Sequence, residues 1–163
     1  MKQHDKFLTK QFKAGTHLPL IDQFYTLQGE GAFTGETAYF IRVGGCDIGC
    51  RWCDEKISWS PALHHSVSVE DIIQNIQDLK GRTLVVTGGE PSLYNLSALT
   101  RESRKIGFKT HIETSGAYKI TGDWDWICVS PKPQSMPLLE NFENANELKV
   151  IIFIILPAAG VKF

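Results

Sequence analysis

Apolar residues along this chain fall into short runs that glycine, proline and asparagine interrupt at close intervals. The runs at residues 18–25 and 39–43 predict two strands, and the stretch between them, residues 28–35, predicts a glycine-rich loop. The continuous apolar run at residues 83–87 predicts a buried strand. Later runs predict further strands at residues 108–113, 125–129 and 148–155.

Two segments have the apolar spacing of helices. In residues 68–80, Ser68 and Asp71 have the spacing of a capping box, and apolar residues recur on one face before Gly81. Residues 91–106 begin at Pro91 and are followed by Gly107, as is typical of the two ends of a helix. The alternation of strands and helices predicts an α/β fold, with a parallel sheet and helices outside it.

The composition indicates one domain. The 163 residues are 42% hydrophobic and 21% charged, which is enough for one well-buried core. We expect a single domain over residues 1–163, with an N-terminal extension at 1–17 and a C-terminal end at 151–163. The net charge of −1 gives no general attraction to nucleic acid or to an anionic membrane. The polar first residues, and an apolar run at 150–156 far below the ~20 residues that span a bilayer, favour a cytoplasmic protein.

Three of the four cysteines lie on one short loop, directly after the strand predicted at 39–43. Cys46, Cys50 and Cys53 have the spacing C-x3-C-x2-C. Thiolates hold iron–sulfur clusters, and a cubane [4Fe–4S] cluster bound by three cysteines has one iron without a protein ligand. That iron is open for chemistry. The fourth cysteine, Cys128, lies in an apolar run, and we expect it in the core.

Other uses of the cysteines are less favoured by the sequence. A tetrahedral zinc site would need a fourth ligand such as His64 or His65, and structural zinc sites usually pair two C-x2-C units. A disulfide framework is less typical of a chain of this length with four cysteines and no apolar leader.

Polar residues follow each predicted parallel strand, where ligands bind in α/β folds. Gly88 and Gly89 allow close approach of a ligand to the backbone, and the Glu90 carboxylate can accept hydrogen bonds from an amine. Thr114, Ser115 and Lys132 follow the next strands. Each of these residues alone is better explained as turn or surface chemistry. Their grouping at one end of the sheet with the cysteines favours a ligand site.

The cysteine loop and the loops at 88–91, 113–116 and 130–132 together resemble those of the radical S-adenosylmethionine (SAM) superfamily. The resemblance implies a partial (β/α) barrel, a [4Fe–4S] cluster, and SAM bound to the open iron. The positions that match the superfamily's SAM contacts are Trp52, Cys53, Asp54, Gly89, Glu90, Thr114, Ser130, Pro131 and Lys132.

A closer resemblance, over residues 20–150, is to the 7-carboxy-7-deazaguanine synthase family within that superfamily. The motifs that carry it are residues 24–31, 40–42 and 50–54 together with Trp59. The resemblance implies a pterin substrate, 6-carboxy-5,6,7,8-tetrahydropterin. The positions that match the family's substrate contacts are Leu27, Gln28, Gly29, Glu30, Arg42 and Thr87.

The resemblance also implies the reaction, a metal ion and partner proteins. The reduced cluster passes an electron to SAM, and the resulting 5′-deoxyadenosyl radical takes hydrogen from the pterin, whose ring contracts with loss of ammonia. Mg2+ and an electron donor such as flavodoxin are implied, and a homodimer is compatible with the family. Glu55 stands where the family has a magnesium-binding threonine, so we expect it at the metal. The chain stops soon after residues 147–149, where family members continue, so we expect a shortened C-terminus.

Two other functions remain open at this point. A glycyl-radical activase shares the cysteine spacing and would act on a protein backbone, although the loop at 27–31 argues against it. A non-catalytic iron–sulfur or zinc-binding module is the alternative outside enzymes. Visible absorption after anaerobic reconstitution separates iron from zinc, and SAM cleavage separates an enzyme from a carrier.

Overall fold

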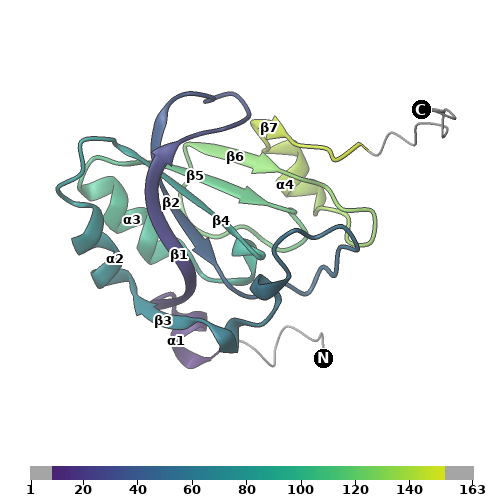
Figure 1. The fold of residues 1–163 in the computed structure, drawn as a ribbon, viewed down its shortest axis with the longest axis horizontal. Helices are drawn as coiled ribbons and strands as arrows, with labels where there is room; N and C mark the ends of the chain where they lie inside the picture. The colour runs from purple at the N-terminus through teal and green to yellow at the C-terminus, as the bar shows by residue number, and fades with distance from the viewer. Residues whose placement is uncertain (1–8, 153–163) are drawn as a thin grey trace, which may run out of the picture.

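The computed structural model describes residues 9–152. Its centre is a seven-stranded sheet in the order β3-β1-β2-β4-β5-β6-β7 (Figure 1). The strands are β1 (His17–Leu27), β2 (Thr37–Val43), β3 (His65–Ser68), β4 (Thr83–Gly88), β5 (Lys109–Thr114), β6 (Trp126–Val129) and β7 (Glu147–Leu148). The helices are α1 (Lys10–Ala14), α2 (Val69–Ile76), α3 (Ser97–Lys105) and α4 (Leu139–Glu143), with 3-10 helices η2 (Lys56–Trp59), η3 (Pro61–Leu63) and η4 (Pro91–Leu93).

The sheet is mostly parallel. Strands β2, β4, β5, β6 and β7 run parallel to one another, and β1 is antiparallel to both β2 and β3. The sheet is open, with β3 and β7 at its two edges. The predicted α/β class and the partial barrel are therefore confirmed. Because the parallel strands share one direction, the loops that follow β2, β4, β5 and β6 emerge at the same end of the sheet.

The main core lies between the sheet and helices α2 and α3 (Figure 1). The apolar stripe predicted in the first helix is confirmed, because Ile72 and Ile76 are fully buried. Ser68 caps α2 by accepting a hydrogen bond from the Asp71 backbone N–H at 3.0 Å. The described part of the predicted N-terminal extension forms α1, and its Phe12 is buried in this core.

The second predicted helix is shorter than expected. Residues 91–106 are divided into η4 and α3, with a break at Tyr94. The Glu90 side chain accepts a hydrogen bond from the Ser92 N–H and starts a single 3-10 turn. Tyr94 then takes an extended conformation, with φ −106° and ψ 155°. Its buried hydroxyl donates to the Gly44 carbonyl at 2.7 Å, so a tertiary contact overrides the local preference for helix.

The prediction of a buried strand at 148–155 is wrong for its described part. Strand β7 has only two residues, Glu147 and Leu148, and Ile151 and Ile152 are 51% and 78% exposed. Pairing stops because its neighbour β6 ends at Val129 and is followed by Ser130 and a proline, which has no N–H to donate. Residues 153–155 lie outside the described range.

Candidate active site

Four loops surround one hollow of about 500 Å3 at the carboxyl ends of β2, β4, β5 and β6. This confirms the expectation that the polar loops meet at one mouth. The lining residues come from the cysteine loop, from the turn after β4, from the end of β5 and from the segment after β6. Among the predicted site residues, those lining it are Glu30, Cys46, Trp52, Cys50, Cys53, Asp54, Glu55, Thr87, Gly89, Glu90, Thr114, Ser130 and Lys132.

The backbone holds the base of the cysteine loop from two sides. On one side, Gly45 N–H donates to the Ser58 carbonyl at 2.5 Å and Cys46 N–H donates to the Trp59 carbonyl at 3.2 Å. On the other side, Glu90 N–H donates to the Gly45 carbonyl at 2.8 Å. The cysteine loop is therefore joined to both η2 and the turn after β4.

The three loop cysteines are free, and each sulfur has a nitrogen donor. The backbone N–H of Ile48 serves Cys46, and burial raises the pKa of the Cys46 thiol to about 12 even though this hydrogen bond lowers it. Gln134 Nε2 lies 3.1 Å from Cys50 Sγ, and Trp59 Nε1 lies 3.4 Å from Cys53 Sγ. N–H groups of this kind stabilise thiolates that bind iron, so the donor set fits a [4Fe–4S] cluster.

None of the histidines in the described part of the chain joins these cysteines in a metal-binding group. His64 donates from Nε2 to the Ile57 carbonyl at 2.9 Å, and His65 pairs with Leu20 in the sheet. In residues 9–152, no three His, Cys, Asp or Glu side chains gather closely enough to hold one metal ion. A cubane cluster needs each cysteine to reach a different iron, whereas one zinc ion needs all its ligands at one point. The geometry therefore favours the cluster over zinc. Cys128 is 3% exposed, as expected for a core residue, and also lines the hollow.

The two glycines at the end of β4, Gly88 and Gly89, are required by packing. Gly88 has φ +123°, and a Cβ there would lie 2.4 Å from the Val43 carbonyl oxygen. A Cβ at Gly89 would lie 2.4 Å from the Gly45 carbonyl oxygen. These residues let β4 and the cysteine loop pack closely together, which supports their explanation as turn residues. Gly89 also lines the hollow, so its backbone remains within reach of a ligand.

Glu90 is 1% exposed and its carboxylate is surrounded by donors. Oε1 accepts from the Ser92 N–H at 3.0 Å and the Ser92 hydroxyl at 2.6 Å, and also from the Thr114 hydroxyl. Oε2 accepts from the Ser115 N–H at 2.9 Å and from the Ser115 hydroxyl. A carboxylate has about four lone-pair sites, so these five contacts occupy it. In this structure, Glu90 joins the loop after β4 to the loop after β5.

The glycine-rich loop between β1 and β2 reaches across the sheet to β7 (Figure 1). Glu147 Oε2 accepts from the Ala32 N–H at 3.3 Å and from Trp126 Nε1 at 3.1 Å. Phe33 packs edge-on against Trp126, with ring centroids 4.8 Å apart. Below this loop, Gln28 is buried, and its Nε2 has no hydrogen-bond partner in the described residues. A buried unpaired donor of this kind suits a polar ligand.

Lys149 lies at the centre of the polar contacts of the loop between β1 and β2. The sequence analysis assigned it no role. Lys149 Nζ contacts Glu113 Oε1 at 2.7 Å and Glu30 Oε1 at 3.1 Å, and Thr87 donates to Glu113 Oε2 at 3.0 Å. Burial opposes the charge of Lys149, but its pairing with Glu113 outweighs this and holds its pKa above the usual value. Glu113 was also missed as a site residue. Its place at the end of a parallel strand was the available signal.

Arg42 does not line the hollow but contacts a residue that does. Its Nη1 lies 3.1 Å from Glu55 Oε2, and its Nε faces Asp22 at 3.5 Å. Glu55 Oε1 has no hydrogen bond in the described residues. Four other predicted contacts, Leu27, Gln28, Gly29 and Pro131, do not line the hollow. Leu27 is 58% exposed at the end of β1.

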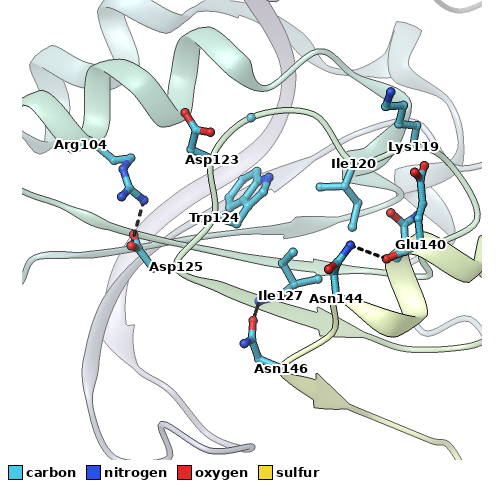
Figure 2. A pocket seen from close by; sticks show the side chains of 12 residues that line it. Arg104, Lys119, Ile120, Asp123, Trp124, Asp125, Ile127, Glu140, Asn144 and Asn146 are labelled. Carbon is cyan, nitrogen blue, oxygen red and sulfur yellow. Dashed lines mark hydrogen bonds and ion pairs between the residues drawn. The ribbon is translucent and has the colours of Figure 1, made fainter.

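A second hollow of about 630 Å3 contains none of the predicted residues. It lies beside α3 and α4 on the helix side of the sheet (Figure 2). Its polar groups largely serve the fold. Arg104 pairs with Asp125 at 2.9 Å, and the Asn146 side chain accepts from the Ile127 N–H at 2.8 Å. The chemistry of the chain is concentrated at the other hollow.

Comparison with known proteins agrees with this geometry. Residues 40–122 match the Radical SAM superfamily, so the chain is a radical SAM enzyme. The superfamily implies a [4Fe–4S] cluster and SAM as cofactors.

None of the helices in residues 9–152 is long and apolar enough to cross a membrane.

Curated relatives place the chain more closely. The 7-carboxy-7-deazaguanine synthase of Flavobacterium psychrophilum is 50% identical, over 90% of this chain and 71% of that protein. The synthase of Synechocystis is 46% identical, over 82% of this chain and 64% of that protein. The crystal structure of QueE from Escherichia coli matches with a TM-score of 0.75 and 36% identity, over 85% of this chain and 72% of that chain. The chain therefore belongs to the 7-carboxy-7-deazaguanine synthase family.

Proposed function

We propose that this chain converts 6-carboxy-5,6,7,8-tetrahydropterin to 7-carboxy-7-deazaguanine, as a carbon–nitrogen lyase of queuosine biosynthesis. One observation carries the proposal. The three cysteines of the open loop and two of the predicted pterin contacts, Glu30 and Thr87, line the same hollow. The residues that would hold the cluster and two of those that would hold the pterin therefore share one space, which supports a reaction between groups bound next to each other.

Cys46, Cys50 and Cys53 would hold the cluster. When bound, the cluster and SAM supply a 5′-deoxyadenosyl radical. The part of the hollow that would bind SAM is lined by Trp52, Asp54, Ser130 and Lys132, and Pro131 shapes the segment after β6. Glu90 would affect SAM binding indirectly, by fixing the positions of Thr114 and Ser115, because its own carboxylate is occupied by protein donors.

The pterin would bind beneath the loop between β1 and β2. Gln28 offers an unpaired buried amide, and Glu30, Glu113 and Thr87 offer oxygen atoms to the amino groups of the pterin edge. The backbone of Leu27 and Gly29 belongs to the same proposed contact. Gln28 is fixed for this role, because its N–H and carbonyl both bond within the loop, to Glu36 and Gly35, at 2.9 Å.

Arg42 would bind the substrate carboxylate, and Mg2+ would be held near Glu55. Mg2+ takes hard oxygen ligands, usually one or two carboxylates together with substrate oxygens and water. Glu55 Oε1 fits this need, while Oε2 faces Arg42. An electron donor such as flavodoxin, a cytoplasmic location and a homodimeric state belong to the same proposal and follow from the resemblance to the family.

The test begins with anaerobic reconstitution of the chain, followed by incubation with SAM, reductant, Mg2+ and the carboxytetrahydropterin. Mass spectrometry is expected to detect the deazaguanine product and ammonia loss. Cys46→Ala, Cys50→Ala and Cys53→Ala should each lose the cluster absorption, and Cys128→Ala is the matched control that should retain it. SAM cleavage without consumption of pterin would contradict the proposed substrate. Retention of the cluster in Cys50→Ala and its loss in Cys128→Ala would overturn the assigned ligands.

A further inference from the structure

Two side chains outside the cysteine loop point N–H groups at the sulfurs of two proposed cluster ligands. Gln134 Nε2 lies 3.1 Å from Cys50 Sγ, and Trp59 Nε1 lies 3.4 Å from Cys53 Sγ. Gln134 is 84 residues from its sulfur in sequence. The third sulfur, of Cys46, is served by the loop's own backbone at Ile48. Only the first two donors can be removed by substitution.

The backbone at each donor residue is held by hydrogen bonds. Trp59 ends η2, and its carbonyl accepts from the Cys46 N–H at 3.2 Å, so the ring is tied to the loop that it serves. Gln134 lies inside a tight turn in which Ser135 N–H donates to the Lys132 carbonyl at 2.9 Å. That turn also carries Lys132, which lines the hollow. These bonds fix the backbone from which each side chain extends toward its sulfur, although the Gln134 side chain itself is exposed.

We propose that Gln134 and Trp59 are positioning residues that set the reduction potential of the cluster by donating N–H···S hydrogen bonds to Cys50 and Cys53. This inference rests on the proposed cluster ligands. One-electron reduction from a low-potential donor takes the cluster from the 2+ to the 1+ state and places more negative charge on its sulfurs. An N–H dipole aimed at sulfur stabilises that added charge, so each donor raises the potential. Loss of either donor lowers it.

The structure also suggests what this tuning does. The donor of Cys50 belongs to the segment after β6, which is part of the proposed SAM site, whereas the donor of Cys53 belongs to η2. Movement of the 132–135 turn would change the Gln134 contact and leave the Trp59 contact in place. The Gln134 contact therefore joins the Cys50 sulfur to the proposed SAM-binding segment, whereas the Trp59 contact does not involve that segment.

The experiment is a redox titration of the reconstituted chain, followed by electron paramagnetic resonance of the 1+ cluster. Gln134→Leu and Trp59→Phe remove one donor each, and Gln134→Glu removes the donor and adds negative charge. At a fixed solution potential, each single loss should lower the ratio of reduced to oxidised cluster by about tenfold, or about 59 mV for a one-electron couple. Gln134→Glu should lower this ratio further. The double variant, with Gln134→Leu and Trp59→Phe, should lower it more than either single substitution does.

Matched controls make the same chemical changes elsewhere. Gln74→Leu changes an exposed glutamine on α2, and Trp124→Phe removes an indole that donates to the Thr121 carbonyl at 3.0 Å. Neither should move the potential. Iron content and melting temperature show whether each variant still folds and loads. An unchanged potential in loaded Gln134→Leu and Trp59→Phe overturns this inference alone. Failure of the unsubstituted chain to assemble a cluster overturns the proposed function as well.

Discussion

Arg42 and Glu55 form an ion pair, with 3.1 Å between Nη1 and Oε2. The pair joins the proposed binding group for the substrate carboxylate to the residue at the proposed magnesium position. Both side chains are about one third exposed, at 31% and 37%, so the pair contributes only about 0–1 kcal/mol. The Glu55 carboxylate therefore pairs with Arg42 where the substrate carboxylate is proposed to bind, and a pair this weak would let the substrate, with Mg2+, replace it.

The first prediction is that Glu55→Thr makes pterin binding less dependent on Mg2+. With Arg42 released, metal-free affinity for the pterin should rise by up to about fivefold, the factor that 1 kcal/mol represents. Affinity for Mg2+ alone should fall, because one hard ligand is lost. Titration of Mg2+ against pterin affinity measures both effects. Glu70→Thr on the exposed face of α2 is the control, and superimposable curves for Glu55→Thr and the unsubstituted chain would place the metal elsewhere.

The second prediction concerns Glu90. Glu90→Ala leaves the buried donors of Ser92, Thr114 and Ser115 without an acceptor, at a cost of about 1–3 kcal/mol in the free energy of unfolding. Its cluster absorption should persist while SAM affinity falls, because the loop after β5 loses its anchor. Calorimetry and equilibrium dialysis measure the two losses. Glu90→Gln keeps the volume and one acceptor oxygen, so its stability and SAM affinity should lie between those of the unsubstituted chain and Glu90→Ala. An unchanged SAM affinity in Glu90→Ala would mean that Glu90 has a structural role only.

The third prediction is that Lys149 and Glu113 act as a unit in pterin binding. Lys149→Met retains the length of the side chain but leaves Glu113 without its cation, so pterin affinity and stability should both fall. Glu113→Gln in the same chain removes the unpaired charge and should restore part of the loss. A double-mutant cycle on pterin binding should give a coupling of about 0.5–3 kcal/mol. Strict additivity of the two substitutions would show that the pair is independent of the ligand.

The fourth prediction concerns acid sensitivity. His111 is 4% exposed below Phe33, with ring centroids 4.6 Å apart, and burial lowers its pKa. Because the folded pKa lies below the unfolded value of about 6.5, the unfolded chain binds the proton first on acidification. The contribution of His111 to stability is therefore fully present above about pH 6.5 and is lost as pH falls through the folded pKa.

Thermal unfolding between about pH 5 and about pH 8 tests this sign. His111→Gln should flatten the dependence of the melting temperature on pH over this range. His65→Gln, at an exposed position in β3, should leave the slope as it is. Equal slopes in the unsubstituted chain and in His111→Gln would mean that another group produces the acid sensitivity.

The sequence by itself determined the elements and the chemistry that depend on residues close together along the chain. The apolar runs predicted β1, β2, β4, β5 and β6, and the capping pair Ser68 and Asp71 predicted the start of α2, because these patterns act within a few residues. The spacing of Cys46, Cys50 and Cys53 indicated the cluster for the same reason: one loop carries all three donors.

Only the tertiary structure decided which side chains face one another across the sheet. The Tyr94 contact with Gly44 broke a helix that the local pattern favoured, and the end of β6 shortened β7 to two residues. Lys149 reaches Glu113 across 36 residues, and Gln134 reaches Cys50 across 84. No local periodicity encodes such pairs, because they depend on strand order and on where each strand ends, which the packing of the whole sheet sets.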